Sequence, residues 1–87
     1  MSGYNGWKNR ATWNVALWIN NDEVLYSKAM NYVRRRKRLK LPISWTGFST
    51  NTSLRYNKTP DGYSYVSSLL CKSELTAMLK EMAKEVD

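Results

Sequence analysis

The sequence predicts an all-α fold, a mini-bundle of three or four helices in a single domain. Apolar residues recur at helical spacing in three segments, and short polar residues that favour helix N-termini precede those segments. A chain of 87 residues can also build only one hydrophobic core. The alternative is an α+β fold with a β-hairpin around residues 54–67.

The first helix is expected over residues 12–20, after a flexible arm at residues 1–6 that contains two glycines. Thr12 is its candidate N-cap, because a threonine hydroxyl can accept a hydrogen bond from a free backbone N–H. Apolar residues cover nearly the whole circumference of this segment, which is typical of a helix in the centre of a small bundle. We therefore expect Trp13 and Trp18 to be buried.

The second helix is expected over residues 23–38. Asp22 is its candidate N-cap, because short polar side chains compete with a helix for backbone groups and favour its ends. Glu23 at the start and the basic residues at the end both suit the helix dipole. Pro42 blocks much further extension.

The middle of the chain, residues 43–70, has the weakest periodicity. The tetrapeptide Thr59-Pro60-Asp61-Gly62 predicts a turn, because proline presets one backbone dihedral and glycine accepts a positive φ. This turn can join residues 54–57 to residues 63–67 as a β-hairpin, or it can be a loop between helices.

The last helix is expected over residues 73–86, with Ser73 as its N-cap and Glu74 in its first turn. Its apolar residues recur at helical spacing and define an amphipathic helix. They are Leu75, Met78, Leu79, Met82 and Val86.

The chain is strongly basic, with 14 Lys and Arg against 7 Asp and Glu and a net charge of +7. Such a field attracts polyanions, so the admissible partners include DNA or RNA and an acidic protein face. The longest apolar stretch is far short of the roughly 20 residues that span a bilayer, so we expect no membrane insertion. The single Cys71 and the lack of a leader-like start predict a cytoplasmic location.

The composition argues against catalysis. The chain has no histidine, and Cys71 therefore has no imidazole to activate it. Asp22 and Glu23 are adjacent, but neighbouring helix positions point apart. No glycine-rich phosphate loop and no metal-ligand spacing occurs, so we expect no enzyme, no cofactor and no metal site.

A basic run gives the strongest local signal for binding. Five consecutive helical residues sweep more than a full turn, so at least three can face the same partner. The run and its neighbour are Arg34, Arg35, Arg36, Lys37, Arg38 and Lys40. The plainer interpretation is a solvated helix end that suits the dipole.

Aromatic rings in the polar segments are the second set of candidates, because exposed rings can stack on unpaired bases. A core role and an interface role remain equally open for each of them. They are Tyr4, Trp45, Tyr56, Tyr63 and Tyr65.

The segment from Trp7 to Glu23, W-K-N-R-A-T-W-N-V-A-L-W-I-N-N-D-E, resembles a family of short proteins of unknown function found largely in bacteriophages and mobile elements. The later stretch from Lys58 to Gly62 and the amphipathic helix after it are also similar to that family. The resemblance implies a helical core and a phage-type accessory protein, and it carries over no catalytic residue. Residues 34–57 depart from the pattern, so function is expected there.

Three hypotheses follow. The first is a host-interaction protein in the host cytoplasm, whose basic face binds an acidic host protein or nucleoprotein and so inhibits or redirects a defence nuclease or RNA polymerase. The second is direct binding to DNA or RNA without sequence specificity. The third is a structural or assembly factor of the virion, and the oligomeric state is left open.

Overall fold

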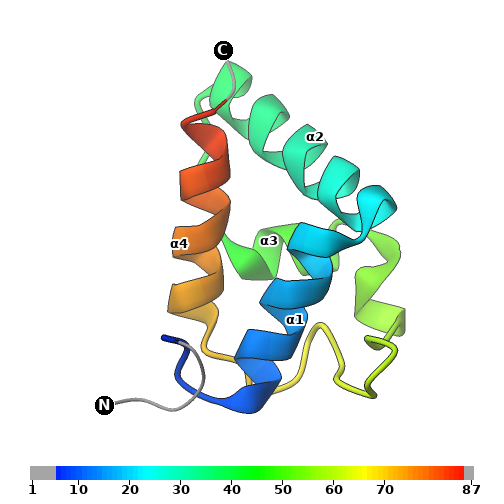
Figure 1. Cartoon of the computed structure of the whole chain (residues 1–87). Helices are drawn as coiled ribbons and strands as arrows, with labels where there is room; N and C mark the ends of the chain where they lie inside the picture. Colours follow the sequence, from blue (N-terminus) through cyan, green and yellow to red (C-terminus); the bar gives the residue numbers. More distant parts are fainter. Residues whose placement is uncertain (1–5, 86–87) are drawn as a thin grey trace.

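The protein is an all-α domain, as the sequence predicts. The computed structural model describes residues 6–85, and this part of the chain folds into four α-helices and one 3-10 helix (Figure 1). They are α1 (Arg10–Asn21), α2 (Glu23–Leu39), α3 (Trp45–Thr50), η1 (Ser53–Tyr56) and α4 (Lys72–Ala83). Most of the expected arm, residues 1–5, lies outside the described residues, as does Tyr4.

The N-cap of α1 is Asn9, so the assignment of Thr12 as the cap is wrong. The Asn9 side chain accepts hydrogen bonds from the Thr12 backbone N–H at 2.8 Å and from the Thr12 hydroxyl at 2.7 Å. Thr12 is buried inside the first turn, and its hydroxyl accepts the backbone N–H of Cys71 at 2.9 Å. A long-range contact of this kind has no signature in local sequence.

A single residue joins α1 to α2. Asp22 is the N-cap of α2, as predicted, and its carboxylate accepts the Leu25 backbone N–H at 3.0 Å. Its own backbone N–H bonds the Trp18 carbonyl at 2.9 Å, so the same residue closes α1. The chain therefore turns a sharp corner here (Figure 1). At its other end α2 stops at Lys40, which has a left-handed φ of 57°.

The middle of the chain forms α3 and η1, which the sequence did not predict. The Ser44 side chain caps α3 by accepting the Gly47 backbone N–H at 2.9 Å. The Thr52 side chain caps η1 by accepting the Leu54 backbone N–H at 3.3 Å. Both elements are a turn or so long, so helical periodicity has too few residues in which to appear.

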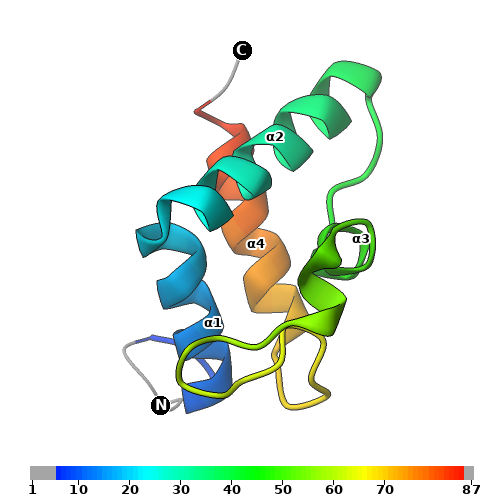
Figure 2. The same ribbon diagram turned by 90° about the vertical axis from the view of Figure 1, so that its right-hand side faces the viewer.

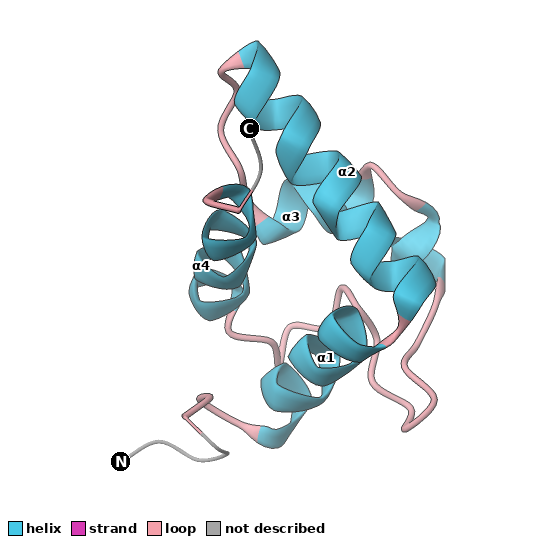
Figure 3. Ribbon diagram, turned by 45° about the horizontal axis from the view of Figure 1, so that its top comes forward, coloured by secondary structure: helices cyan, strands magenta, loops and turns pink. Residues whose placement is uncertain are grey.

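No β-hairpin forms in the described chain (Figure 3). An isolated bridge between Lys58 and Ser64 is what remains of that alternative. The predicted turn between them is present: the Gly62 backbone N–H bonds the Thr59 carbonyl at 2.8 Å, and Gly62 has a φ of 96°. The turn therefore belongs to a loop that joins helices.

The N-cap of the last helix, α4, lies two residues earlier than expected. Its N-cap is Cys71, which makes no side-chain capping bond, whereas Ser73 lies in the first turn and does not cap. The Leu75 backbone N–H bonds the Cys71 carbonyl at 3.2 Å and sets this start. The expected end at Val86 lies outside the described residues.

The core lies between the four α-helices, and α3 packs against α4 and η1 (Figure 2). Trp45 and Phe48 of α3 are its largest fully buried side chains. Trp13 and Trp18 are only partly buried, so the expectation for them is wrong. The smaller side chains of α1, such as Ala11, fill its inward face, and the two indoles flank it.

Candidate polyanion-binding groove

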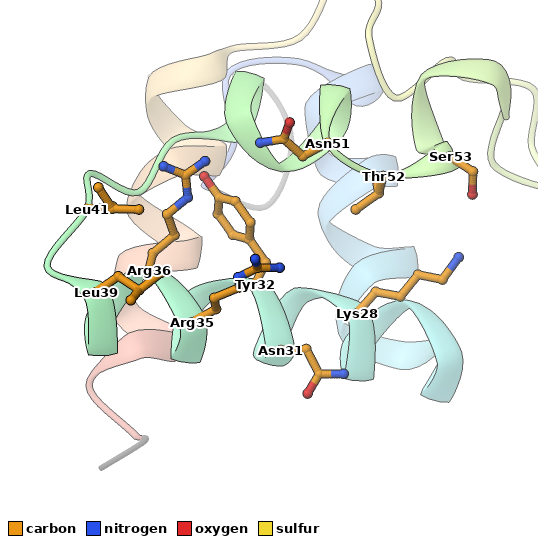
Figure 4. Close-up of a pocket in the computed structure, with 10 residues that line it drawn as sticks. All are labelled: Lys28, Asn31, Tyr32, Arg35, Arg36, Leu39, Leu41, Asn51, Thr52 and Ser53. Carbon is orange, nitrogen blue, oxygen red and sulfur yellow. The ribbon is translucent and has the colours of Figure 1, made fainter.

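A surface groove of about 710 Å³ lies between α2 and the segment that joins α3 to η1 (Figure 4). We call it the basic groove. The residues that line it are Lys28, Asn31, Tyr32, Arg35, Arg36, Leu39, Leu41, Asn51, Thr52 and Ser53. None of these lining residues, all of which the structure describes, carries a carboxylate. A groove whose charged side chains are all cations favours an anionic ligand.

One face of α2 forms the first wall of the basic groove. Lys28, Tyr32, Arg35 and Leu39 follow one another at intervals of three or four residues, so they share a stripe along the helix. The stripe runs for roughly 16 Å at 1.5 Å per residue. A neighbouring face carries the buried residues Ala29 and Val33, which attach α2 to the core.

Tyr32 fixes α2 against α3. Its hydroxyl lies 3.2 Å from the Ser44 carbonyl, to which it donates, and accepts the Ser44 backbone N–H at 3.3 Å. Its ring packs on Phe48 with 5.4 Å between ring centroids, and the Arg36 guanidinium carbon lies 5.2 Å from the Tyr32 centroid. A Cβ at Gly47 would lie 2.6 Å from the Tyr32 hydroxyl, so this close approach requires glycine.

The second wall consists of Asn51, Thr52 and Ser53. Thr52 is engaged within the chain, because its hydroxyl donates to the Phe48 carbonyl at 3.0 Å and also caps η1. Asn51 and Ser53 are exposed and present an amide and a hydroxyl to the groove. These groups can donate hydrogen bonds to phosphate oxygens.

The basic run does not form one surface. Arg35 and Arg36 line the basic groove, whereas Arg34, Arg38 and Lys40 are exposed elsewhere on or beyond α2. Lys37 points the other way, because its ammonium donates to the Ala83 carbonyl at 2.9 Å at the end of α4. This bond connects α2 to the end of α4, while the Lys37 residue as a whole stays exposed, so its binding to a partner stays a prediction.

The candidate aromatic rings fall into a buried group and an exposed one. Trp45 is fully buried and its indole N–H donates to the Tyr65 carbonyl at 2.9 Å, while Tyr65 itself is only 2% exposed. Burial raises the pKa of the Tyr65 phenol. Both rings belong to the core, and Tyr63 packs partly buried against it. Tyr56, which is 76% exposed, is the candidate ring that faces solvent.

Sequence reasoning missed Lys28 and the whole second wall. The spacing of Lys28, Tyr32, Arg35 and Leu39 is visible in the sequence and could have identified the α2 stripe. No local pattern brings residues 51–53 opposite that stripe, because their position depends on how α3 packs. The exposed Leu39 and Leu41 at one end of the groove were missed for the same reason.

A second polar cluster lies on α1 and holds the turn at Asp61. The Asp61 carboxylate accepts the side-chain N–H groups of Asn14 at 2.7 Å and Trp18 at 3.0 Å. These two bonds hold the pKa of the Asp61 carboxyl below its ordinary value. The carboxylate is therefore occupied by groups of its own chain.

No group of three or more metal-ligating side chains gathers within the described residues. Cys71 is half-buried, and its Sγ lies 3.3 Å from the Ser73 hydroxyl. No helix in the described part of the chain is long and apolar enough to cross a membrane.

The fold and the groove together define a small helical domain with a basic groove on its surface. The chain belongs to a family of unknown function, DUF7249, whose model matches residues 1–86. The matched range includes residues 34–57, which were expected to depart from the family pattern. Searches of curated proteins and of solved structures found no significant match.

Proposed function

We propose that this protein is a non-catalytic binding domain that holds the phosphate backbone of a nucleic acid in the basic groove. The observation that carries the proposal is the groove itself: three cations, Lys28, Arg35 and Arg36, line it without a carboxylate among its neighbours. Phosphate contacts of this kind supply most of the affinity of non-specific nucleic-acid binding.

The remaining chemistry of the basic groove supports the same ligand. Arginine can bind phosphate oxygens with two N–H groups at once, and Arg35 is exposed and able to do so. The Tyr32 ring supports the Arg36 guanidinium and limits its freedom, which lowers the entropy lost on binding. Asn51 and Ser53 add neutral donors across the groove.

Fluorescence anisotropy with labelled DNA and RNA tests the proposal. Native protein should bind at about 50 mM salt and lose most of its affinity at about 200 mM, because each neutralised phosphate contributes about −0.7 to −0.9 to the log–log salt slope. The double variant Lys28→Gln with Arg35→Gln should weaken binding and flatten this slope.

A matched control separates the groove from the overall field. Arg34→Gln with Arg38→Gln removes the same charge from the same helix, but neither residue lines the groove. This control should keep most of the affinity. Equal loss in the two double variants would mean that net charge attracts the nucleic acid and that the groove does not bind it.

A second candidate partner is an acidic protein, as expected for a phage-type protein that occupies a host nucleic-acid machine. Leu39 and Leu41 favour it, since they are 51% and 45% exposed at one end of the basic groove. Exposed apolar side chains beside arginines are typical of protein interfaces. Leu39→Ser with Leu41→Ser should weaken capture of such a partner much more than nucleic-acid binding, because a leucine side chain makes no hydrogen bond or ion pair with a phosphate.

A further inference from the structure

Resting on the proposed function, we infer that the preferred ligand is a single-stranded nucleic acid, and that one of its bases stacks on Tyr56 just beyond the basic groove. Two observations carry this inference. Tyr56 is the large apolar side chain most exposed in the described chain, and η1 connects it directly to the groove wall at Ser53.

The geometry of η1 places the ring on the side of the groove. A 3-10 helix has three residues per turn, so the side chains of Ser53 and Tyr56 are eclipsed on one face. Ser53 lines the basic groove, while Leu54 points into the core with 1% exposure. Tyr56 therefore continues the groove wall by one turn, roughly 6 Å along the helix axis.

The groove leads toward this ring. Figure 4 places Leu39, Leu41 and Arg36 at one end of the groove, and Lys28 and Ser53 at the other. A backbone that follows the cations from Arg36 to Lys28 leaves the groove beside η1. The roughly 6 Å from Ser53 to Tyr56 is less than two nucleotide steps at about 3.4 Å each in a stacked strand.

The Tyr56 ring has the exposure and the supporting contacts that base stacking requires. Tyr56 remains 76% exposed even though the Arg55 guanidinium carbon lies 4.7 Å from its ring centroid, so an open face is left for a base. Arg55 also donates a hydrogen bond to the Tyr56 hydroxyl, which limits movement of the ring. A base on the open face would complete a sandwich of base, phenol and guanidinium.

Duplex ligands cannot use this ring in the same way. Their bases are paired and stacked on one another, and exposing one face costs a few kcal/mol of unstacking. An unpaired base pays no such cost, and its stacking on an aromatic side chain strengthens binding. The structure therefore predicts a preference for single strands that depends on one side chain.

The test uses labelled oligomers of dT and of rU, each about 10 nucleotides long, and a DNA hairpin duplex in anisotropy titrations at low salt. Tyr56→Ala should raise the Kd for single strands by about 5- to 150-fold and leave the Kd for the duplex unchanged. Tyr56→Phe keeps the ring and should keep the affinity. Comparing dT with rU shows which of these two oligomers is preferred.

The controls separate this inference from the proposed function. Leu69→Ala removes an apolar side chain that is 64% exposed and lies outside the groove, and it should change neither Kd. Unchanged single-strand binding by Tyr56→Ala, with weakened binding by the Lys28 and Arg35 variant, would overturn stacking but keep the groove. If Tyr56→Ala weakened the binding of single strands and of the duplex equally, stacking on Tyr56 would also be overturned. Failure of native protein to bind any oligomer would overturn both proposals.

Discussion

Two polar regions of this small domain use their side chains in opposite ways. The first, which we call the α1 joint, lies on or just before α1 and consists of Asn9, Thr12, Asn14 and Trp18. Each of these side chains bonds to the loop between η1 and α4 or to the start of α4. The second is the basic groove, where Arg35 is exposed and Lys28 is partly exposed.

The difference separates side chains that bond within the fold from side chains that are left to solvent. In the α1 joint most polar side chains bond to groups of the same chain: Asn9 donates to the Leu69 carbonyl at 2.7 Å, and Asp61 accepts from two side chains, although the buried Asn14 Oδ1 has no hydrogen-bond partner. In the basic groove like charges stand together, which is unfavourable for folding unless a ligand neutralises them. Most of the segment that carries the family resemblance is therefore scaffold.

The largest expected effect contrasts a core ring with a surface ring. Trp45→Ala should lower the free energy of unfolding by about 3–5 kcal/mol, because it removes a fully buried indole and its hydrogen bond to Tyr65. Tyr56→Ala should change it by no more than about 0.5 kcal/mol. Urea unfolding followed by circular dichroism measures both changes. A similar loss of stability in the two variants would contradict the assignment of Trp45 to the core and Tyr56 to the surface.

Next in size is the contribution of the α1 joint. Thr12→Val keeps the shape of the side chain but leaves the Cys71 N–H without its acceptor, so it should cost about 1–3 kcal/mol. Thr50→Val is the control, because Thr50 is exposed and its hydroxyl bonds only locally, to the Thr46 carbonyl. Equal unfolding midpoints for the two variants would show that the joint does not stabilise the fold.

A smaller effect should depend on pH. The lowered pKa of Asp61 means that its stabilisation is complete above the unfolded value of 3.8 and is lost as the pH falls through the folded value. Asp61→Asn should therefore lower Tm at neutral pH by less than Thr12→Val does, because solvent screens this exposed carboxylate.

The gap in Tm between native protein and Asp61→Asn should shrink as the solution is acidified below pH 3.8. Thermal unfolding at a series of pH values measures it. A gap that stays constant down to strong acid would mean that the charge of Asp61 does not support the turn.

The helices that sequence could predict are those long enough to show a period. The Asp22 corner and the 3.6-residue pattern of α2 are local features, and both were predicted correctly. The starts of α1 and α4 were missed because Asn9 and Cys71 are fixed by contacts between distant segments, including the Thr12 bond to Cys71.

The candidate site could be predicted only in part. The run of cations in the sequence indicates a basic surface on α2, but it does not show that Lys37 bonds the end of α4 while Arg35 lines the groove. The burial of Trp45 within a polar segment depends on α3, a helix too short to predict. Charge was visible in the sequence, whereas the arrangement of that charge required the tertiary structure.

The most direct test of the account is an NMR titration of the isotope-labelled protein with the oligonucleotide that binds best. Backbone amide signals of residues 28–39 and 51–56 should shift in proportion to occupancy, while those of residues 9–18 and 59–71 should stay in place. Shifts concentrated on the α1 joint, with the basic groove unchanged, would contradict the division of this domain into a scaffold and a binding surface.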